Sequence, residues 1–325
     1  MFTWKKGVAL VSMVLLGLSL AACGSQPSAT NQPAKDKKLV VGFAQIGAES
    51  EWRTAETNSI KETAEKLGVD LKFSDAQQKQ ENQIKAIRSF IAQKVDVIAL
   101  APVVESGWET VFKEAKDAKI PIILVDRGAK VDESLYTTFI GSDFIQEGKN
   151  AAAEMAKLLN NKGNIVELQG TVGASAANDR KKGFEEGLQA FPDMKIIKSQ
   201  SGDFTRAKGK EVMEAFLKSD GKNIQAVYAH NDDMAIGAIQ AIEEYGLKPG
   251  VDIKVVSIDG VKGIFEAMAA GKANVTVECN PLLGPQLFDA AKKLAAGEKV
   301  ERWIKTEESI FRADTAKEVL PTRKY

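Results

Sequence analysis

The residues best suited to chemistry lie where short apolar runs give way to polar clusters. Residues 228–234 read Tyr-Ala-His-Asn-Asp-Asp-Met, and they stand between an apolar run at 224–227 and a helical pattern at 235–242. This position corresponds to the carboxyl end of a strand and the first turn of a helix, where unpaired amide N–H groups attract carboxylates and amides. In open parallel sheets, ligands bind in the crevice at such ends. Asn231 is therefore a candidate ligand-binding residue.

Three further polar clusters occupy equivalent positions after predicted strands. They are residues 49–53, 126–127 and 259–260. A carboxylate such as Asp126 can accept hydrogen bonds from two neighbouring hydroxyls, and the guanidinium of Arg127 donates in a fixed fork. Four strand ends with carboxylates, amides and arginines predict a site for a small, hydroxyl-rich molecule. The alternatives are an exposed ion pair at 126–127, and an Asp259 that only caps the helix beginning near residue 261.

Four more side chains complete the candidate site. Arg180 lies at a predicted helix start, where a cation opposes the helix dipole, so we expect it to have an anionic or ligand partner. Trp52 and Phe204 follow strands at matching places in the two halves of the chain, and they could stack on the two faces of a sugar ring. Glu278 ends a strand before a predicted crossover. The alternatives are a solvated arginine and two aromatic residues that serve as hydrophobic staples.

The sequence disfavours most enzyme classes. His230 is the single histidine, so any Ser-His-Asp relay or histidine-led zinc site would have to use it. No Gly-x-Ser-x-Gly, phosphate-binding loop or Cys-x-x-Cys motif occurs, and the glycine-rich run at 170–175 does not match a dinucleotide-binding loop. We therefore expect no catalytic residues, no cofactor and no metal, and we interpret His230 as a packing or hydrogen-bonding residue. A glycosidase that uses two carboxylates remains the enzymatic alternative.

Short apolar runs alternate with amphipathic segments throughout the rest of the chain. The predicted strands are 39–44, 69–73, 95–100, 121–125, 136–140, 164–168, 195–199, 226–229, 253–258, 274–277, 303–305 and 309–311. The predicted helices are 52–67, 78–93, 107–118, 146–159, 179–190, 206–218, 232–245, 263–270 and 285–296. Continuous apolar strands joined by helices indicate parallel sheets that are buried on both faces.

Two successive series of about five strands favour two α/β lobes over one very wide sheet. We expect residues 39–141 plus about 281–308 to form the N-terminal lobe, and residues 142–280 plus about 309–325 to form the C-terminal lobe. Several crossings between the lobes would make a hinge.

The first 38 residues read as a targeting signal and a tether. Lys5 and Lys6 precede an apolar stretch at 7–20 that is short for a membrane span. The sequence Leu20-Ala21-Ala22-Cys23 resembles the bacterial lipoprotein cleavage box, which predicts removal of residues 1–22 and lipidation of Cys23; the alternative is an ordinary signal peptide. Residues 23–38 are rich in Ser, Pro, Asn, Gln and Lys and predict a flexible tether. Cys279 is then left without a disulfide partner.

The composition sets further limits on function. The 325 residues include 44 basic and 44 acidic side chains, and this balance argues against nucleic acid as the main partner. An apolar content of 44% and 7% aromatic residues are typical of a soluble globular protein.

Taken together, these motifs resemble the sugar-binding proteins of bacterial ABC importers, specifically the ribose-binding-like group and its galactofuranose-binding members. The resemblance covers residues 39 to about 315. It rests on runs at 49–53, 77–83, 101–104, 166–175, 179–184, 199–206 and 228–234. The sequence departs from those members at Glu51, where they have a small residue, and in the segment 278–284, which is one residue shorter.

The resemblance implies a periplasmic-binding-protein-like fold of type I, with a monosaccharide held between two lobes. It implies partners in the form of a permease and its ATPase, with a chemoreceptor or sensor kinase as the alternative. It also implies an exported, monomeric protein anchored outside the cell membrane through Cys23. The binding positions that it implies are Glu49, Ser50, Trp52, Arg53, Asp126, Arg127, Arg180, Phe204, Asn231, Asp259 and Glu278.

Overall fold

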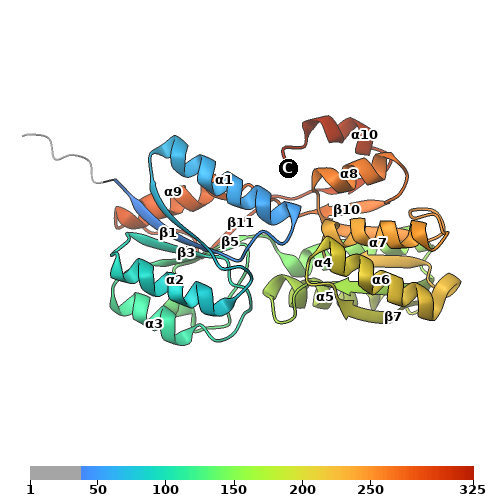
Figure 1. Ribbon diagram of the computed structural model, residues 1–325, viewed down its shortest axis with the longest axis horizontal. Coiled ribbons are helices and arrows are strands. Elements are labelled where there is room, and N and C mark those ends of the chain that lie inside the picture. Colours follow the sequence, from blue (N-terminus) through green and yellow to red (C-terminus); the bar gives the residue numbers. More distant parts are fainter. Residues whose placement is uncertain (1–37) are drawn as a thin grey trace, which may run out of the picture. The chain divides into compact units, whose positions relative to one another are not determined.

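Two six-stranded sheets form the framework of residues 38–325, the part of the chain that the computed structural model describes (Figure 1). The first sheet has the strand order β11-β5-β4-β3-β1-β2, and the second has the order β12-β10-β9-β8-β6-β7. We call the half built on the first sheet lobe 1 and the other half lobe 2. The predicted fold of two α/β lobes with parallel sheets is confirmed.

Lobe 1 consists of a sheet covered by helices on both faces. Its strands are β1 (Val40–Gln45), β2 (Asp70–Asp75), β3 (Val97–Leu100), β4 (Ile122–Val125), β5 (Thr138–Gly141) and β11 (Trp303–Lys305). Its helices are α1 (Glu51–Leu67), α2 (Gln80–Ala92), α3 (Glu109–Asp117), the short 3₁₀ turn η1 (Glu133–Leu135) and α9 (Gly284–Ala295). Two apolar clusters hold this arrangement together: α1 and α9 pack on one face, and α2 and α3 pack on the other.

Lobe 2 repeats this architecture around one continuous apolar core. Its strands are β6 (Gly163–Gln169), β7 (Met194–Ser201), β8 (Ala226–Ala229), β9 (Lys254–Asp259), β10 (Val275–Glu278) and β12 (Ile310–Arg312). Its helices are α4 (Phe144–Leu159), α5 (Ser175–Leu188), α6 (Arg206–Asp220), η2 (Gly221–Asn223), α7 (Asp232–Glu244), α8 (Lys262–Ala269), α10 (Ala316–Val319) and η3 (Leu320–Thr322).

The chain passes between the lobes three times. It crosses after β5, after β10 and between β11 and β12, because β11 belongs to the first sheet and β12 to the second. Strand β12 runs antiparallel to β10, whereas the other strand pairs of residues 38–325 are parallel. The residue boundaries predicted for the lobes remain a prediction.

Helix α5 differs from its predicted start at residue 179. It begins at Ser175, after a small-residue run with no apolar periodicity, and its N-cap Ala174 makes no side-chain hydrogen bond. Arg180 therefore lies in the second turn. Helices α4 and α5 approach closely because both carry glycine at the contact: a Cβ at Gly148 would lie 2.4 Å from the Arg180 carbonyl oxygen, and a Cβ at Gly183 would lie 2.1 Å from that of Ile145. This contact between the helices fixes the position of Arg180 relative to α4.

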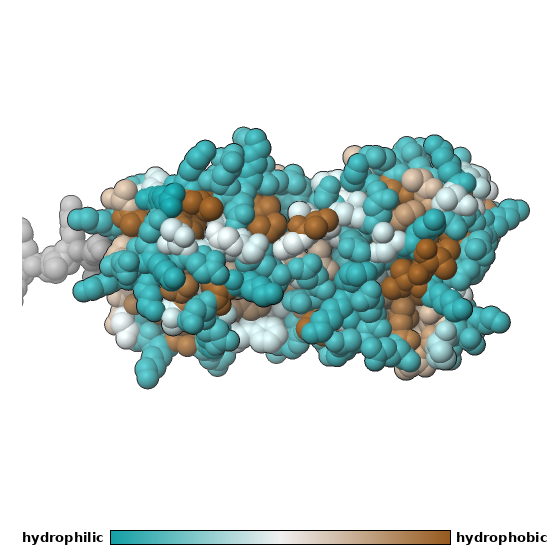
Figure 2. Space-filling view, turned by 90° about the horizontal axis from the view of Figure 1, so that it is seen from below, coloured by the Kyte–Doolittle hydropathy of each residue, from teal (hydrophilic) through white to brown (hydrophobic). Residues whose placement is uncertain are grey.

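The predicted signal sequence, the predicted lipidation site at Cys23 and most of the predicted tether lie outside the described residues. Within residues 38–325, no helix has the length and apolar character needed to cross a membrane. On the face shown in Figure 2, hydrophilic side chains predominate and hydrophobic ones form separate groups.

Candidate functional site

A cavity of about 290 Å³ lies between the lobes, where strand ends and helix starts meet. Ten of the eleven predicted site residues line it, and Glu278 does not. The lining residues are Glu49, Ser50, Trp52, Arg53, Asp126, Arg127, Ala176, Arg180, Phe204, Asn231, Asp259 and Cys279. Sequence reasoning missed Ala176 and Cys279. The sequence identifies Cys279 only as a thiol without a disulfide partner, and nothing in the pattern around Ala176 singles that residue out.

The start of α1 supplies a buried network of alternating charges. Ser50 is the N-cap, and its Oγ accepts a hydrogen bond from the Arg53 amide at 3.1 Å. This cap directs Arg53 inward, where Nη2 donates to Asp126 Oδ2 at 2.6 Å and Nε donates to Glu49 Oε1 at 3.2 Å. Nη1 donates to Glu56, which also accepts from Gln45. Charge-assisted hydrogen bonds of this kind hold the charged side chains on the lobe 1 side of the cavity in fixed orientations.

Arg127 completes the lobe 1 side. Its guanidinium lies 4.9 Å from the centre of the Phe204 ring and 3.7 Å from Glu49 Oε1. Burial and the neighbouring positive charge of Arg53 lower the pKa of Arg127 to about 10. Arg127 Nε and Glu49 Oε2 are buried and have no hydrogen-bond partner among the described residues. Unpaired buried polar atoms are costly, so both atoms are suited to pair with hydroxyls of a bound molecule.

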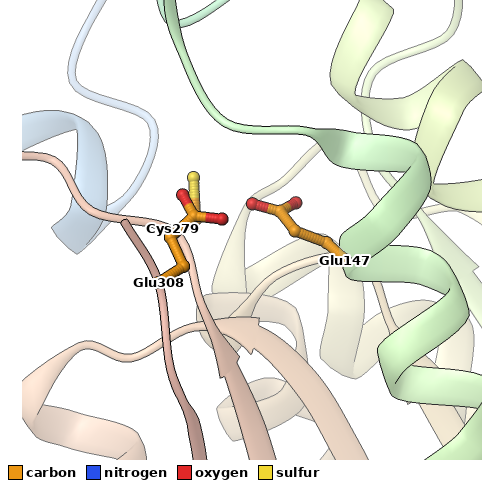
Figure 3. A group of neighbouring side chains, drawn as sticks. All are labelled: Glu147, Cys279 and Glu308. Carbon is orange, nitrogen blue, oxygen red and sulfur yellow. The ribbon is translucent and has the colours of Figure 1, made fainter. Parts of the chain in front are cut away.

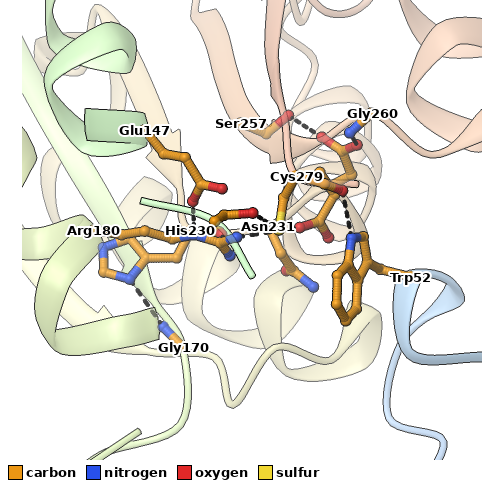
Figure 4. A network of polar contacts seen from close by, with 12 residues as sticks. Trp52, Glu147, Gly170, Arg180, His230, Asn231, Ser257, Gly260 and Cys279 are labelled. Atoms are coloured by element: carbon orange, nitrogen blue, oxygen red, sulfur yellow. Dashed lines mark hydrogen bonds and ion pairs between the residues drawn. The ribbon is translucent and has the colours of Figure 1, made fainter. Parts of the chain in front are cut away.

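Arg180 is the corresponding cation of lobe 2 (Figure 4). Its Nε donates to Glu147 Oε2 at 2.7 Å, and its Nη1 donates to the His230 carbonyl oxygen at 2.6 Å. Its Nη2 lies 3.6 Å from Asp259 Oδ1. Arg180 is 3% exposed, so the solvated-arginine alternative is wrong, and the expected anionic partners are Glu147 and Asp259.

The three residues that open α7 divide three tasks between them. Asn231 caps the helix by accepting from the Met234 amide at 3.0 Å, and its Nδ2 donates to the Phe204 carbonyl oxygen at 3.0 Å. Asp232 accepts from the Gly260 and Val261 amides at 2.7 and 2.9 Å. Asp232 therefore binds the two amides that directly precede α8, and no side chain caps the helix itself, so the alternative that Asp259 caps it is wrong.

Asp233 forms a contact between the lobes at the rim of the cavity. Its Oδ2 accepts from the Glu51 amide at 2.7 Å, and its Oδ1 accepts from Arg206 Nη2 at 2.9 Å. Glu51 belongs to lobe 1, whereas Asp233 and Arg206 belong to lobe 2. Because the bond from the Glu51 amide joins the two lobes, the described conformation is closed at this edge.

Both predicted aromatic residues line the cavity. Trp52 is 4% exposed, and its Nε1 donates to the Cys279 carbonyl oxygen at 2.6 Å. Phe204 is also 4% exposed, and it has a positive φ of 61°. Asp126 and Asp259 have positive φ angles of 62° and 132°. Backbone of this kind costs of order 1–3 kcal/mol per residue and clusters at functional sites.

The predicted role of Glu278 in the cavity needs correction. Its Oε1 accepts from Arg323 Nη1 and from Tyr325 Oη, both at 2.8 Å, and its Oε2 accepts from the Ser309 amide at 3.1 Å. The C-terminal segment thus binds this carboxylate away from the cavity. The next residue, Cys279, takes the lining position instead.

His230 supports the site from behind, which confirms its expected structural role. It is fully buried; its Nδ1 accepts from the Gly170 amide at 3.3 Å, and its Nε2 lies 3.1 Å from Glu167 Oε1. The Nε2 proton therefore points at Glu167. Burial lowers the pKa of His230. Burial alone would raise the pKa of Glu167, but its contacts with His230, Ser199 and Lys181 outweigh burial and lower the pKa to about 2.

Comparison with known proteins agrees with this geometry. Residues 41–299 match the family described as periplasmic binding protein domain. The chain is 58% identical to the galactofuranose-binding protein YtfQ of Escherichia coli K12, over 88% of this chain and 92% of that protein. It is 32% identical to the ribose import binding protein RbsB of Bacillus subtilis, over 92% of this chain and 96% of that protein.

Solved structures give the same result. The crystal structure of a galactofuranose binding protein has a TM-score of 0.86 and 58% identity, and the match covers 88% of this chain and 98% of that one. A protein from Mycobacterium smegmatis in complex with β-D-fucofuranose has a TM-score of 0.86 and 55% identity, with coverage of 88% and 95%. The chain therefore belongs to the periplasmic binding protein family, in its sugar-binding branch.

Proposed function

We propose that this protein is the substrate-binding component of an ABC sugar importer, and that it binds one monosaccharide in furanose form, galactofuranose or a close relative. The observation that carries the proposal is the convergence of carboxylates, arginines and two aromatic residues from both lobes on one cavity of about 290 Å³. The names of the galactofuranose- and fucofuranose-binding relatives support the furanose form.

The ten predicted residues that line the cavity each have a role in this proposal. Trp52 and Phe204 stack on the ring faces, where C–H groups meet aromatic carbon. Charged and amide side chains read the hydroxyl pattern; they are Glu49, Asp126, Asn231 and Asp259 as acceptors, and Arg53, Arg127 and Arg180 as donors. Ser50 positions Arg53. Glu278 has no part, because its carboxylate is bound to the C-terminal segment.

The proposed mechanism is capture without chemistry. The lobes separate and close by rotation at the three crossovers, and the closed form carries the sugar to the permease and its ATPase. We further propose that the protein is exported, acts as a monomer and is held at the outer face of the cell membrane by lipid on Cys23. That anchor rests on the sequence of residues 1–23.

Calorimetric titration of the purified chain with galactofuranose, arabinofuranose, fucofuranose and galactopyranose tests the binding step. We expect one sugar per chain and the highest affinity for a furanose. A lack of heat with every sugar, or preference for the pyranose, would contradict the proposal.

Two activity measurements separate the proposal from its rivals. Sustained hydrolysis of an aryl furanoside by the purified chain would favour a glycosidase. Stimulation of ATP hydrolysis by a reconstituted permease and ATPase, dependent on both sugar and this chain, is the outcome expected for an importer component. Its absence would favour a sensory role.

A further inference from the structure

Three side chains with metal-binding atoms meet at the hinge, beside the cavity (Figure 3). Glu147 lies on α4, Cys279 follows β10 and Glu308 precedes β12. One ligand atom from each of the three lies within 4.8 Å of the others. Glu147 precedes both Cys279 and Glu308 by more than a hundred positions in the sequence, so only the fold brings the three residues together.

The carboxylate of Glu147 is partly unpaired. Its Oε2 accepts from Arg180 Nε at 2.7 Å, whereas its Oε1 is buried and has no well-aligned hydrogen-bond partner among residues 38–325; the Cys279 thiol is the potential donor beside this carboxyl group. Glu147 is 1% exposed, and in Figure 3 its carboxylate points toward Cys279 and Glu308. A buried oxygen in this state calls for a donor or a cation, because a buried acceptor without a partner destabilises the folded state.

Carboxyl groups outnumber the single guanidinium near this cluster. Glu308 accepts hydrogen bonds from the hydroxyls of Ser142 and Thr306, which are neutral. The guanidinium of Arg180 faces Glu147 and also lies 3.6 Å from Asp259. One arginine thus faces two carboxylates, and Glu308 adds a third nearby. Burial raises the pKa of Glu147 to about 8 and also raises the pKa of Glu308.

We propose that Glu147, Cys279 and Glu308 form a binding site for a borderline-soft divalent cation, with Zn²⁺ as the best match. A thiolate with two carboxylates suits Zn²⁺, whereas Mg²⁺ and Ca²⁺ prefer oxygen ligands alone. Binding forms a sulfur–zinc bond, and the Cys279 thiol and the Glu147 carboxyl group each give a proton to solvent. Glu147 Oε1 and one Glu308 oxygen supply the other two protein ligands, and water fills the fourth position.

Such a cation would act on the hinge. It would join α4 of lobe 2 to the crossovers that follow β10 and precede β12. It would also draw Glu147 from Arg180, which lines the sugar cavity, so cation and sugar binding would be coupled. The site itself does not depend on the identity of the sugar.

Cobalt titration tests the site through a signal that only a thiolate gives. The sample is the full chain without an affinity tag and with Cys23→Ser, which leaves Cys279 as the one thiol. We expect Co²⁺ to produce a thiolate-to-cobalt charge-transfer band at one equivalent, Zn²⁺ to abolish the band by displacement, and Cys279→Ser to lack it. No band from the folded parent, or a band that survives in Cys279→Ser, overturns the proposal.

A matched pair of glutamates provides the second measurement. Glu308→Gln removes a proposed ligand, whereas Glu307→Gln makes the same change at the exposed neighbouring residue. We expect Glu308→Gln to weaken Zn²⁺ binding at least about tenfold, in line with losses on removal of groups around metal sites, and Glu307→Gln to leave it unchanged. Equal zinc affinities in the two variants overturn the assignment. Sugar calorimetry on both variants reports separately on the proposed function.

Discussion

The two lobes present charge to the cavity in different ways. In lobe 1, Arg53 binds Asp126, Glu49 and Glu56, and Arg127 lies near two of the same carboxylates. In lobe 2, a single guanidinium, that of Arg180, is held by Glu147, Asp259 and a carbonyl oxygen. The charge pairing on the lobe 1 side of the cavity is therefore redundant, because each charge has several partners. The lobe 2 side depends on one cation, Arg180.

The lobes also differ in how their site residues are assembled. The lobe 1 residues come from two short segments, 49–53 and 126–127. The lobe 2 residues come from α5, the ends of β8 and β9, and the loop that follows β7. The lobe 1 residues are adjacent in the sequence, so their grouping can be predicted from the sequence alone. The grouping of the lobe 2 residues depends on the packing of α4 on α5 and of α7 on α8.

Loss of Arg180 is expected to have the largest effect on sugar affinity. Arg180→Ala removes donors to the sugar and leaves Glu147 and Asp259 without their cation, so we expect about a hundredfold weaker binding, given about 1.5–3 kcal/mol for each charge-assisted bond. Calorimetry measures the affinity, and circular dichroism checks the fold. Unchanged affinity in a folded variant would show that Arg180 does not contact the ligand.

Two buried glutamates of lobe 2 should respond to pH in opposite directions. Glu147 has its pKa raised to about 8, so the folded state holds a proton that the unfolded state releases above its pKa of 4.5. Its contribution to the free energy of unfolding therefore falls as pH rises from about 4.5 to about 8, by at most about 1.4 kcal/mol per pH unit.

Glu167 shows the reverse pattern. Its pKa is lowered to about 2, so its contribution is present above pH 4.5 and is lost as pH falls toward 2. Urea unfolding across this pH range, with Glu147→Gln and Glu167→Gln as variants, measures both effects. The first variant should lose the decline toward alkaline pH, and the second should lose the decline toward acid. The same pH dependence in both variants would contradict this assignment.

Asp126→Ala should have a smaller effect than Arg180→Ala, because Arg53 keeps Glu49 and Glu56 as partners. We expect about tenfold weaker sugar binding, which corresponds to the loss of one charge-assisted bond. The same calorimetric titration gives the result. A loss as large as that of Arg180→Ala would break the comparison, since lobe 1 would then show no redundancy.

The rim contact between the lobes should have the smallest effect. Asp233→Asn weakens the bonds to the Glu51 amide and to Arg206, whose side chain is 50% exposed, but Asp233 does not line the cavity. Exposed pairs contribute little, so we expect the sugar to dissociate about threefold faster in stopped-flow experiments. Glu211→Gln on the exposed face of α6 serves as the control. A dissociation rate that rises tenfold or more would show that Asp233 is essential for holding the sugar.

The sequence by itself determined the order of strands and helices, the two-lobe fold and most of the cavity. Apolar runs and helical spacing are local properties, and the rule that ligands bind at the carboxyl ends of parallel strands turns them into positions. Asp126 and Arg127 could therefore be predicted to lie at the cavity from the strand that precedes them.

Only the tertiary structure decided which role each of several adjacent polar residues has. Asn231 lines the cavity, Asp232 binds the amides that precede α8 and Asp233 bridges the rim, although all three are polar and adjacent. Glu278 binds the C-terminal segment, and Cys279 lines the cavity in its place. The physical reason is that the direction of a side chain at a strand end depends on segments that pack there from distant parts of the chain. The local periodicity of the sequence does not show which distant segments pack at a given strand end.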